Sequence, residues 1–376
     1  MRIGINARLF IKGKMEGVAT YIHENVKRMI ANHPEDTFIL FFDRSIDFDH
    51  LTTLDNVIAV KVFPPTRHPI LWEIWWQYRI PHLLKKYKVD VFYTGEVFMP
   101  RKTSVPKVIV SHDLAYLHYP EQIPNPVLSY YKRTYPLNHK QADKIIAVSE
   151  ATKQDVINQY GIPENKIDVI HNASPSGFKT LDENQKEIVR EKYTDGKAYF
   201  AYLGSFHPRK NIVNLIKGFE HFKSNSQTDH KLLLMGRWAW KTEKIKSALN
   251  NSIHRNDIVL VEDVGEEKYK LVAASEGLCY ISLFEGFGIP ILEGFSAGVP
   301  IISSNVSSMP EVAGDAALLV DPNSPEAIGN AMNDLAENNS LRDSLIQKGF
   351  ERVKVFDWDK SAAKTYEVLR SVRSTK

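Results

Sequence analysis

Short apolar segments alternate with longer amphipathic segments along almost the whole chain. In the first half, the apolar segments predict strands at 3–5, 38–42, 57–62, 89–93, 108–110, 144–148 and 168–170. Helical periodicity fills the intervals, most clearly at 18–31, 72–87, 127–140 and 151–160. Strands and helices that alternate in this way build a parallel sheet with helices on its faces. The pattern therefore predicts an α/β fold of the doubly wound, Rossmann-like type.

The alternation is interrupted at Asn172-Ala-Ser-Pro-Ser-Gly177, which is rich in turn-forming residues. Beyond this segment it resumes from Tyr199 to about Val320. A chain of 376 residues with 43% hydrophobic residues is long enough for two domains of ordinary size. We therefore predict two similar domains, 1–175 and 176–357. Because open α/β sheets bind ligands outside the carboxyl ends of their strands, we expect the site in the cleft between these domains.

Two glutamates lie eight residues apart in Phe284-Glu-Gly-Phe-Gly-Ile-Pro-Ile-Leu-Glu293, after an apolar run at 277–283 that predicts a buried strand. The two glycines suit a turn, and Pro290 suits the first turn of a helix. Glu285 then lies on the turn and Glu293 inside the helix, where they can hold two ends of one ligand. A lone pair of this kind can also be a turn cap and a solvated helix residue. The N–H groups expected to bind phosphate belong to Gly286, Phe287, Gly288 and Ile289.

A second buried strand is predicted at 198–204, and it ends at Gly204. The sequence Ser205-Phe-His-Pro-Arg-Lys-Asn211 and an amphipathic helix follow. Arg209 and Lys210 therefore lie where a strand gives way to a helix, on the same wall as Glu285. An isolated Arg-Lys pair is usually a solvated basic pair, but two fixed cations near a helix N-terminus suit a diphosphate.

Three segments in this order resemble the retaining glycosyltransferases of family 4, which have the two-domain GT-B architecture. They are 204–211, the pair Glu285 and Glu293, and Ser303-Ser-Asn-Val-Ser-Ser-Met-Pro-Glu-Val-Ala-Gly-Asp315. The resemblance extends over nearly the whole chain. It implies transfer of a hexose from a nucleotide diphosphate sugar to a glycan or lipid-linked acceptor, with retention of configuration. It also implies that a C-terminal helix, 358–376, crosses back to pack on the first domain.

The resemblance assigns roles to individual side chains. Glu293 binds the ribose hydroxyls, Glu285 contacts the sugar, and the two cations stabilise the departing diphosphate. No enzyme carboxylate is required as a nucleophile, since the departing phosphate oxygen can deprotonate the acceptor on the same face. The expected catalytic residues are Glu285, His112, Arg209 and Lys210. The expected donor-binding residues are Gly204, Arg209, Lys210, Gly286, Phe287, Gly288, Ile289 and Glu293.

The first domain must supply the acceptor-side wall, and its candidate loops are 13–20, Gly95-Glu96, His112-Asp113 and Ser149-Glu150. A His-Asp pair at a strand end commonly stabilises a turn, but in the family a histidine at this place approaches the transferred sugar. In the loop 13–20, Glu16 stands where the family usually has the first of two glycines. Gly17 still allows close approach of the backbone to a ligand, with a plain surface loop as the alternative. We expect Gly17 and Asp113 on the acceptor side.

Neither a metal nor a cofactor is expected. Asp47-Phe-Asp49 and Asp357-Trp-Asp359 have the Asp-x-Asp spacing of metal-dependent transferases, but neither follows a buried strand. We interpret the first as a surface loop and the second as the start of the C-terminal helix. Arg209, Lys210 and the backbone amides at the helix start can stabilise the charge of the diphosphate in place of a metal ion.

Composition restricts the function classes only weakly. The net charge of +3 is too small to indicate binding to nucleic acid. The one cysteine, Cys279, lies in an apolar strand pattern, so we expect a core thiol rather than a disulfide or a nucleophile. No signal peptide or membrane-spanning run is recognised, which predicts a cytoplasmic protein.

The stretch 64–88 interleaves aromatic and basic residues. We interpret it as a core helix that packs Leu71, Trp75, Tyr78 and Leu83, with the pattern ending at Pro81. The alternative is peripheral contact with the inner face of the membrane or with a lipid-linked acceptor.

Two other functions stay open: a nucleotide-sugar epimerase of GT-B fold and a non-catalytic nucleotide-sugar-binding protein. A dinucleotide-dependent dehydrogenase is disfavoured because no Gly-x-Gly-x-x-Gly follows the first strand. The expected donor is a GDP- or UDP-linked hexose. The segments 209–211 and Gly236-Arg-Trp238 favour a mannose-like sugar. The sequence does not specify the donor base, the acceptor or the oligomeric state.

Overall fold

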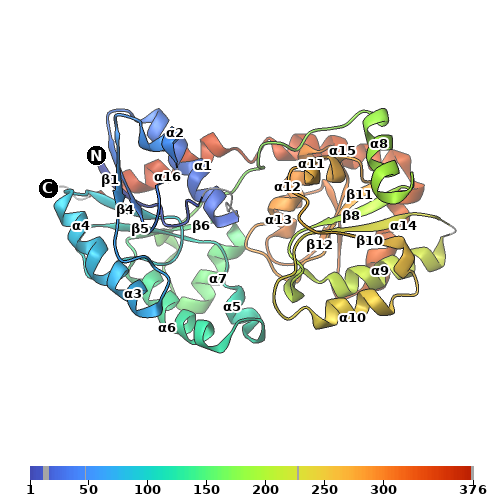
Figure 1. Cartoon of the computed structure of the whole chain (residues 1–376), viewed down its shortest axis with the longest axis horizontal. Coiled ribbons are helices and arrows are strands. Elements are labelled where there is room, and N and C mark those ends of the chain that lie inside the picture. Colours follow the sequence, from blue (N-terminus) through green and yellow to red (C-terminus); the bar gives the residue numbers. More distant parts are fainter. Residues whose placement is uncertain (12–16, 47, 227, 374–376) are drawn as a thin grey trace. The chain divides into compact units, whose positions relative to one another are not determined.

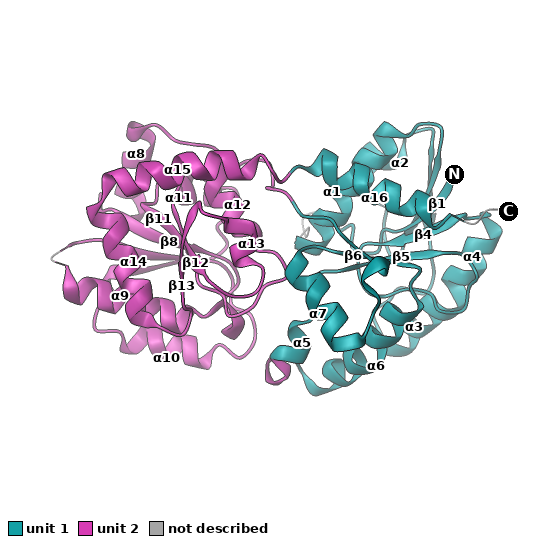
Figure 2. Cartoon of the chain, turned by 180° about the vertical axis from the view of Figure 1, so that it is seen from behind, with its two compact units in different colours: residues 1–118, 123–172, 357–376 teal, residues 119–122, 173–356 magenta. Residues whose placement is uncertain are grey.

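The computed structural model describes residues 1–11, 17–46, 48–226 and 228–373 (Figure 1). They form two compact units (Figure 2). Unit 1 comprises residues 1–118, 123–172 and 357–376, and unit 2 comprises residues 119–122 and 173–356. Each unit has one parallel sheet with helices around it, so the predicted two-domain, Rossmann-like α/β fold is confirmed.

The sheet of unit 1 has the strand order β3-β2-β1-β4-β5-β6-β7. Strands β1 and β4 are neighbours although they are far apart in sequence, so the strand order reverses between them. This is the point at which open α/β sheets leave a crevice for ligands. The strands are β1 Arg2–Asn6, β2 Thr37–Phe42, β3 Val57–Lys61, β4 Val91–Thr94, β5 Lys107–Ser111, β6 Lys144–Ala147 and β7 Ile167–Val169.

Helices cover both faces of this sheet because its strands are apolar on both sides and almost fully buried. The main helices are α1 Gly17–Asn32, α2 Asp49–Thr52, α3 Pro69–Ile74, α4 Ile80–Lys86, α5 Ala115–His118, α6 Asn125–Gln141, α7 Glu150–Tyr160 and α16 Trp358–Ser371.

Helices α3 and α4 are joined without a break by a π-helical turn, η1 Trp75–Arg79. The prediction that the helical pattern ends at Pro81 is wrong, because Pro81 lies in the first turn of α4. A π turn rearranges the backbone hydrogen bonds, which accommodates a residue without an N–H group. Trp75 and Leu83 are buried and Leu71 is half-buried, as expected, but Tyr78 is 60% exposed. The core position predicted for Tyr78 is therefore wrong, since the extra residue of the π turn rotates it off the buried face.

The sheet of unit 2 has the strand order β10-β9-β8-β11-β12-β13, which matches the order of the first six strands in unit 1. Cys279 is fully buried in β11, as predicted for a core thiol. The strands are β8 Tyr199–Leu203, β9 Lys231–Met235, β10 Ile258–Val261, β11 Gly277–Tyr280, β12 Ile301–Ser304 and β13 Ala317–Val320. The helices are α8 Glu183–Thr194, α9 Ile212–Asn225, α10 Glu243–Asn251, α11 Glu267–Ala273, α12 Ile289–Ser296, α13 Met309–Ala313, α14 Pro325–Glu337 and α15 Asn339–Val353.

The C-terminal helix α16 belongs to unit 1, where it packs beside α1. Buried Asn25 of α1 accepts hydrogen bonds from the hydroxyls of Ser361 and Thr365 at 3.0 and 3.3 Å. Asp357 caps the start of α16 by accepting from two backbone N–H groups, as expected for a helix start. Phe356 packs on Phe287 in unit 2. The last residue of unit 2 and the first helix turn after it are thus each fixed by packing or capping.

None of the helices in the described ranges has the length and apolar character needed to span a bilayer.

Candidate functional site

The glycine turn between β11 and α12 is built as the sequence predicts. Gly288 adopts a φ of 107°, a conformation that disfavours side chains, and Pro290 lies in the first turn of α12. The Ser308 hydroxyl lies within hydrogen-bonding distance of two carbonyl oxygens of this turn, that of Glu285 at 2.9 Å and that of Phe287 at 2.8 Å. The turn is therefore fixed, with the positive end of α12 directly after it.

Glu285 lies between two cations. One of its carboxylate oxygens is 2.9 Å from the Arg209 guanidinium and the other is 2.6 Å from Lys210 Nζ. Both cations come from the short 3-10 turn Pro208–Lys210, which follows β8 and precedes α9. Arg209 also donates to the carbonyl oxygen of Phe284. The structure thus brings together Arg209, Lys210 and Glu285 at the carboxyl edge of the unit 2 sheet.

The charge state of Glu285 follows from these neighbours. The carboxylate is buried, which favours the neutral acid, but Arg209 and Lys210 outweigh this effect and lower its pKa to about 2. Glu285 is therefore ionised at neutral pH, and the three side chains together carry one net positive charge. Lys210 Nζ also donates to the hydroxyl of Tyr280 at 3.0 Å.

Glu293 has the opposite electrostatic environment. It is buried on α12, which begins after the turn that holds Glu285, and burial raises its pKa to about 7 in spite of Lys268 and Lys210. The two carboxyl groups named by the sequence therefore differ in charge near neutral pH. A buried carboxyl group with a pKa near 7 is a candidate functional group.

Gly204 directly follows β8 and lies beside Gly236, which directly follows β9. A Cβ atom on Gly236 would lie 1.8 Å from the carbonyl oxygen of Gly204, so the two strand ends can approach this closely only because residue 236 has no side chain. The Gly204 N–H donates to the carbonyl oxygen of Met235 at 3.0 Å. Gly204 thus shapes this strand edge.

His207 was not predicted as a site residue. Its Nδ1 accepts from the Arg209 N–H at 3.3 Å, while the buried Nε2 has no hydrogen-bond partner within the described chain. Burial, then the charges of Arg209 and Lys210, lower its pKa to about 4, so the ring is neutral. The only signal in the sequence is that this histidine precedes Pro-Arg-Lys in a position that caps the turn.

In unit 1, His112 follows β5 and is half-buried. Its Nε2 lies 2.8 Å from the carbonyl oxygen of Gly95, to which it donates, and its ring meets the ring of Tyr21 edge to face. Burial lowers the pKa of His112 although the Gly95 carbonyl raises it. Asp113 accepts from the Ala115 N–H at 3.0 Å, which is the turn-stabilising arrangement.

The remaining acceptor-side candidates are more dispersed. Gly17 is the exposed first residue of α1, and a Cβ atom there would meet no described atom within 4 Å. Residues 13–16 of the predicted loop and Asp47 of the first Asp-x-Asp lie outside the described residues. Ser149 caps α7 by accepting from the Thr152 N–H. No group of three or more His, Cys, Asp or Glu side chains able to hold a metal ion occurs among the described residues.

The sequence pointed to Glu96 but missed its partners. Arg8, after β1, donates to Glu96 through a 2.7 Å ion pair, and Asn6 donates to the same carboxylate at 2.7 Å. Arg8 also lies over the ring of Trp72, 4.5 Å from its centroid. This Asn6–Arg8–Glu96 cluster lies at the ends of β1 and β4, where the strand order of unit 1 reverses.

Two family models match the chain in succession. Glycosyltransferase Family 4 matches residues 15–174, and Glycosyl transferases group 1 matches residues 183–352. The second match contains all of the Arg209, Lys210, Glu285 and Glu293 constellation.

Proteins of known name and structure are similar to all or most of the chain. O-antigen chain mannosyltransferase B of Escherichia coli is 27% identical over 375 residues, covering 96% of this chain and 97% of that protein. O-antigen chain mannosyltransferase RfbU of Salmonella typhimurium is 22% identical over 291 residues, or 76% of each chain. The crystal structure of Anabaena HepE in complex with UDP-glucose superposes with a TM-score of 0.74 at 17% identity, covering 99% of this chain and all of that one.

Proposed function

Because this chain belongs to the group 1, family 4 glycosyltransferases of GT-B fold, we propose that it transfers a hexose from a nucleotide diphosphate sugar to a glycan or lipid-linked acceptor. The observation that carries the proposal is the trio of Arg209, Lys210 and Glu285 beside the start of α12. Two cations and a helix N-terminus are the elements that stabilise a departing diphosphate.

The donor sugar we propose is mannose. The support comes from relatives such as O-antigen chain mannosyltransferase B of Escherichia coli and RfbU of Salmonella typhimurium. We propose a guanosine or uridine diphosphate as the carrier, with the ribose hydroxyls held by Glu293. Burial of Glu293 inside α12 supports a fixed contact of this kind.

The proposed reaction retains the configuration at the anomeric carbon. The bond from that carbon to the phosphate oxygen breaks, and the electron pair leaves with the diphosphate. The acceptor hydroxyl forms the new bond on the same face, and its proton passes to the departing phosphate oxygen. Arg209, Lys210 and the first amides of α12 stabilise the growing negative charge on the diphosphate.

Glu285 has a supporting role in this proposal. It is ionised and holds both cations, which keeps them positioned before the donor arrives. Preorganised charges of this type stabilise a transition state without reorganisation during the reaction. We propose that the reaction proceeds without a metal ion and that no resident cofactor takes part.

The experiment is incubation of the protein with GDP-mannose, UDP-glucose and UDP-galactose, each with mannose- and glucose-containing acceptors. A glycosylated product whose new linkage has the donor's anomeric configuration by NMR is the expected result. An isomerised donor would identify an epimerase instead. Unchanged donor that raises the melting temperature would identify a binding protein.

A further inference from the structure

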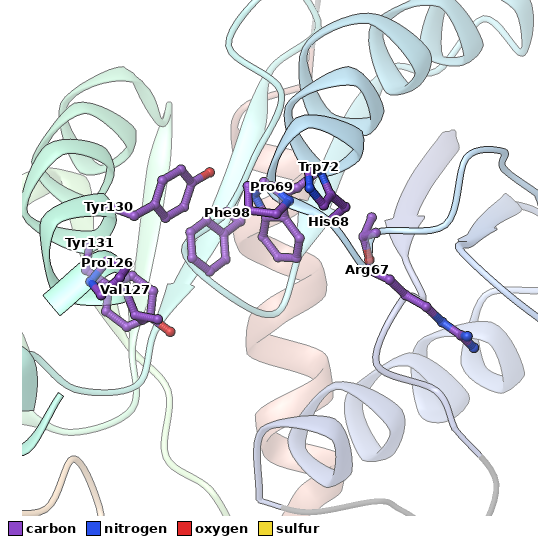
Figure 3. A pocket seen from close by; sticks show the side chains of 10 residues that line it. Arg67, His68, Pro69, Trp72, Phe98, Pro126, Val127, Tyr130 and Tyr131 are labelled. Atoms are coloured by element: carbon purple, nitrogen blue, oxygen red, sulfur yellow. The ribbon is translucent and has the colours of Figure 1, made fainter. Parts of the chain in front are cut away.

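Unit 1 contains a hollow of about 500 Å³ with aromatic walls (Figure 3). Its rings come from Trp72 of α3, from Phe98 after β4, and from Tyr130 and Tyr131 of α6. Pro69, Pro126 and Val127 lie at its exposed rim. A volume of this size falls within the range of roughly 300–1,000 Å³ that is typical of small-molecule sites.

The hollow adjoins the carboxyl edge of the unit 1 sheet. Phe98 lies two residues after Glu96. The Arg8 guanidinium, which pairs with Glu96, lies over the ring of Trp72. The aromatic walls therefore continue from the Asn6–Arg8–Glu96 cluster at the switch point of the sheet.

The walls are rigid and amphipathic. Trp72 and Phe98 meet nearly at right angles with centroids 4.9 Å apart, and Phe98 and Tyr130 are close to parallel at 5.9 Å. The Tyr130 hydroxyl donates to Glu73 at 2.9 Å, which fixes that ring. The apolar ring faces and the polar ring edges thus have fixed positions around one space.

This geometry suits a sugar ring. A pyranose has an apolar face of C–H groups, which the negative face of an aromatic ring attracts, and an edge of hydroxyls that needs polar partners. We propose that the hollow binds a pyranose unit of the acceptor glycan against the rings of Trp72, Phe98 and Tyr130. The inference rests on the proposed glycosyl transfer and assigns its acceptor class.

Two other occupants fit less well. A hydrocarbon chain favours aliphatic walls, but Val127 is the one aliphatic side chain besides two prolines among the described lining residues. An anion requires a cation directed at it, whereas the Arg67 side chain extends away from the aromatic rings (Figure 3). Arg8, which lies over Trp72, is already paired with Glu96, and the His68 ring accepts from the Ile70 N–H. The hollow is therefore matched to a neutral, amphipathic ring.

The test fills the hollow from its rim. Val127 on α6 is 39% exposed, so Val127→Trp adds bulk there without disturbing the core. Leu137→Trp is the matched control, since Leu137 lies on the same helix, is 44% exposed and does not line the hollow. Binding of methyl α-D-mannopyranoside, methyl α-D-glucopyranoside and α-1,3-mannobiose is titrated by ligand-observed NMR, with GDP and UDP as probes of unit 2 and farnesyl phosphate as a hydrocarbon probe.

The expected result is saturable binding of at least one glycan to the wild type and to Leu137→Trp. Val127→Trp should bind that glycan at least tenfold more weakly, with unchanged nucleotide affinity and melting temperature. Equal glycan affinity in all three proteins overturns the proposal, as does glycan binding to none of them while a nucleotide still binds. If Val127→Trp weakens the binding of farnesyl phosphate but not of any glycan, the proposal is overturned and the hollow binds a lipid. Failure of both nucleotides to bind the wild type contradicts the proposed function itself.

Discussion

The ammonium group of Lys210 lies 2.6 Å from Glu285 Oε1, inside a site where the glutamate is buried. Arg209 holds the other oxygen of the same carboxylate. One buried carboxylate therefore satisfies two cations, and a diphosphate that enters the site must compete with it for them. Under the proposed function, we expect the balance between these two anions to affect both the affinity for nucleotide and the stability of the turn.

Arg209→Ala and Lys210→Ala should each lower kcat by about a hundredfold or more, as loss of a preorganised oxyanion partner does. Steady-state kinetics with the best donor measures the effect. Lys244→Ala, at an exposed position of α10, is the control and should behave as the wild type. Normal turnover in both site variants would remove these cations from the mechanism.

Glu285→Gln should reduce turnover while free nucleotide diphosphate binds as tightly as before or more tightly, because the competing charge is gone. Glu293→Gln should weaken free nucleotide and donor alike by about 10- to 100-fold when binding is measured above the Glu293 pKa of about 7, where this carboxyl group is ionised, since a hydrogen bond to a charged group contributes about 1.5–3 kcal/mol. Isothermal titration with GDP and UDP distinguishes the two. Equal weakening in both variants would contradict the assigned roles.

Burial raises the pKa of Glu293 to about 7, whereas its ordinary value is 4.5. Between these values the folded chain binds more protons than the unfolded chain, so the free energy of unfolding falls as pH rises from about 4.5 to about 7. Glu293→Gln removes this contribution. Urea denaturation of both proteins at several pH values should show their stability difference changing over this window and constant outside it. A pH-independent difference would contradict the raised pKa.

Activity should persist in excess chelator if the two cations and the helix amides take the place of a metal. The assay is product formation in EDTA, with added magnesium or manganese as the comparison. A complete loss that either ion restores would show that the reaction depends on a divalent cation.

Removal of residues 357–376 should destabilise unit 1. It leaves the buried side chain of Asn25 without the hydroxyls of Ser361 and Thr365, and it uncovers the face of α1 that packs on α16. The truncated chain should unfold at a lower denaturant concentration than the full chain, and its turnover should be reduced. An unchanged unfolding midpoint together with unchanged activity would show that the helix is dispensable.

Much of the fold follows from local patterns. The apolar runs predicted every strand of unit 1 to within about two residues, because parallel strands buried on both faces have no polar alternation to obscure them. The turn around Gly288 and Pro290 was predictable for a similar reason, since few other residues suit that backbone. The helix predicted at 72–87 extends from Pro69 to Lys86, and its π turn at Trp75–Arg79 was not predicted because a π turn leaves no signature in helical periodicity.

The sequence by itself determined the two α/β domains, the glycine turn and the residue types of the candidate site, because those depend on local periodicity and backbone preference. Only the tertiary structure decided how these residues pair. It showed that Arg209 and Lys210 share one carboxylate, that Glu285 and Glu293 have opposite pKa shifts, and that Arg8 and Asn6 converge on Glu96. Such pairings join residues up to 90 positions apart in the sequence. The charge states of these residues depend on burial and on distances in the folded chain, which no local sequence pattern encodes.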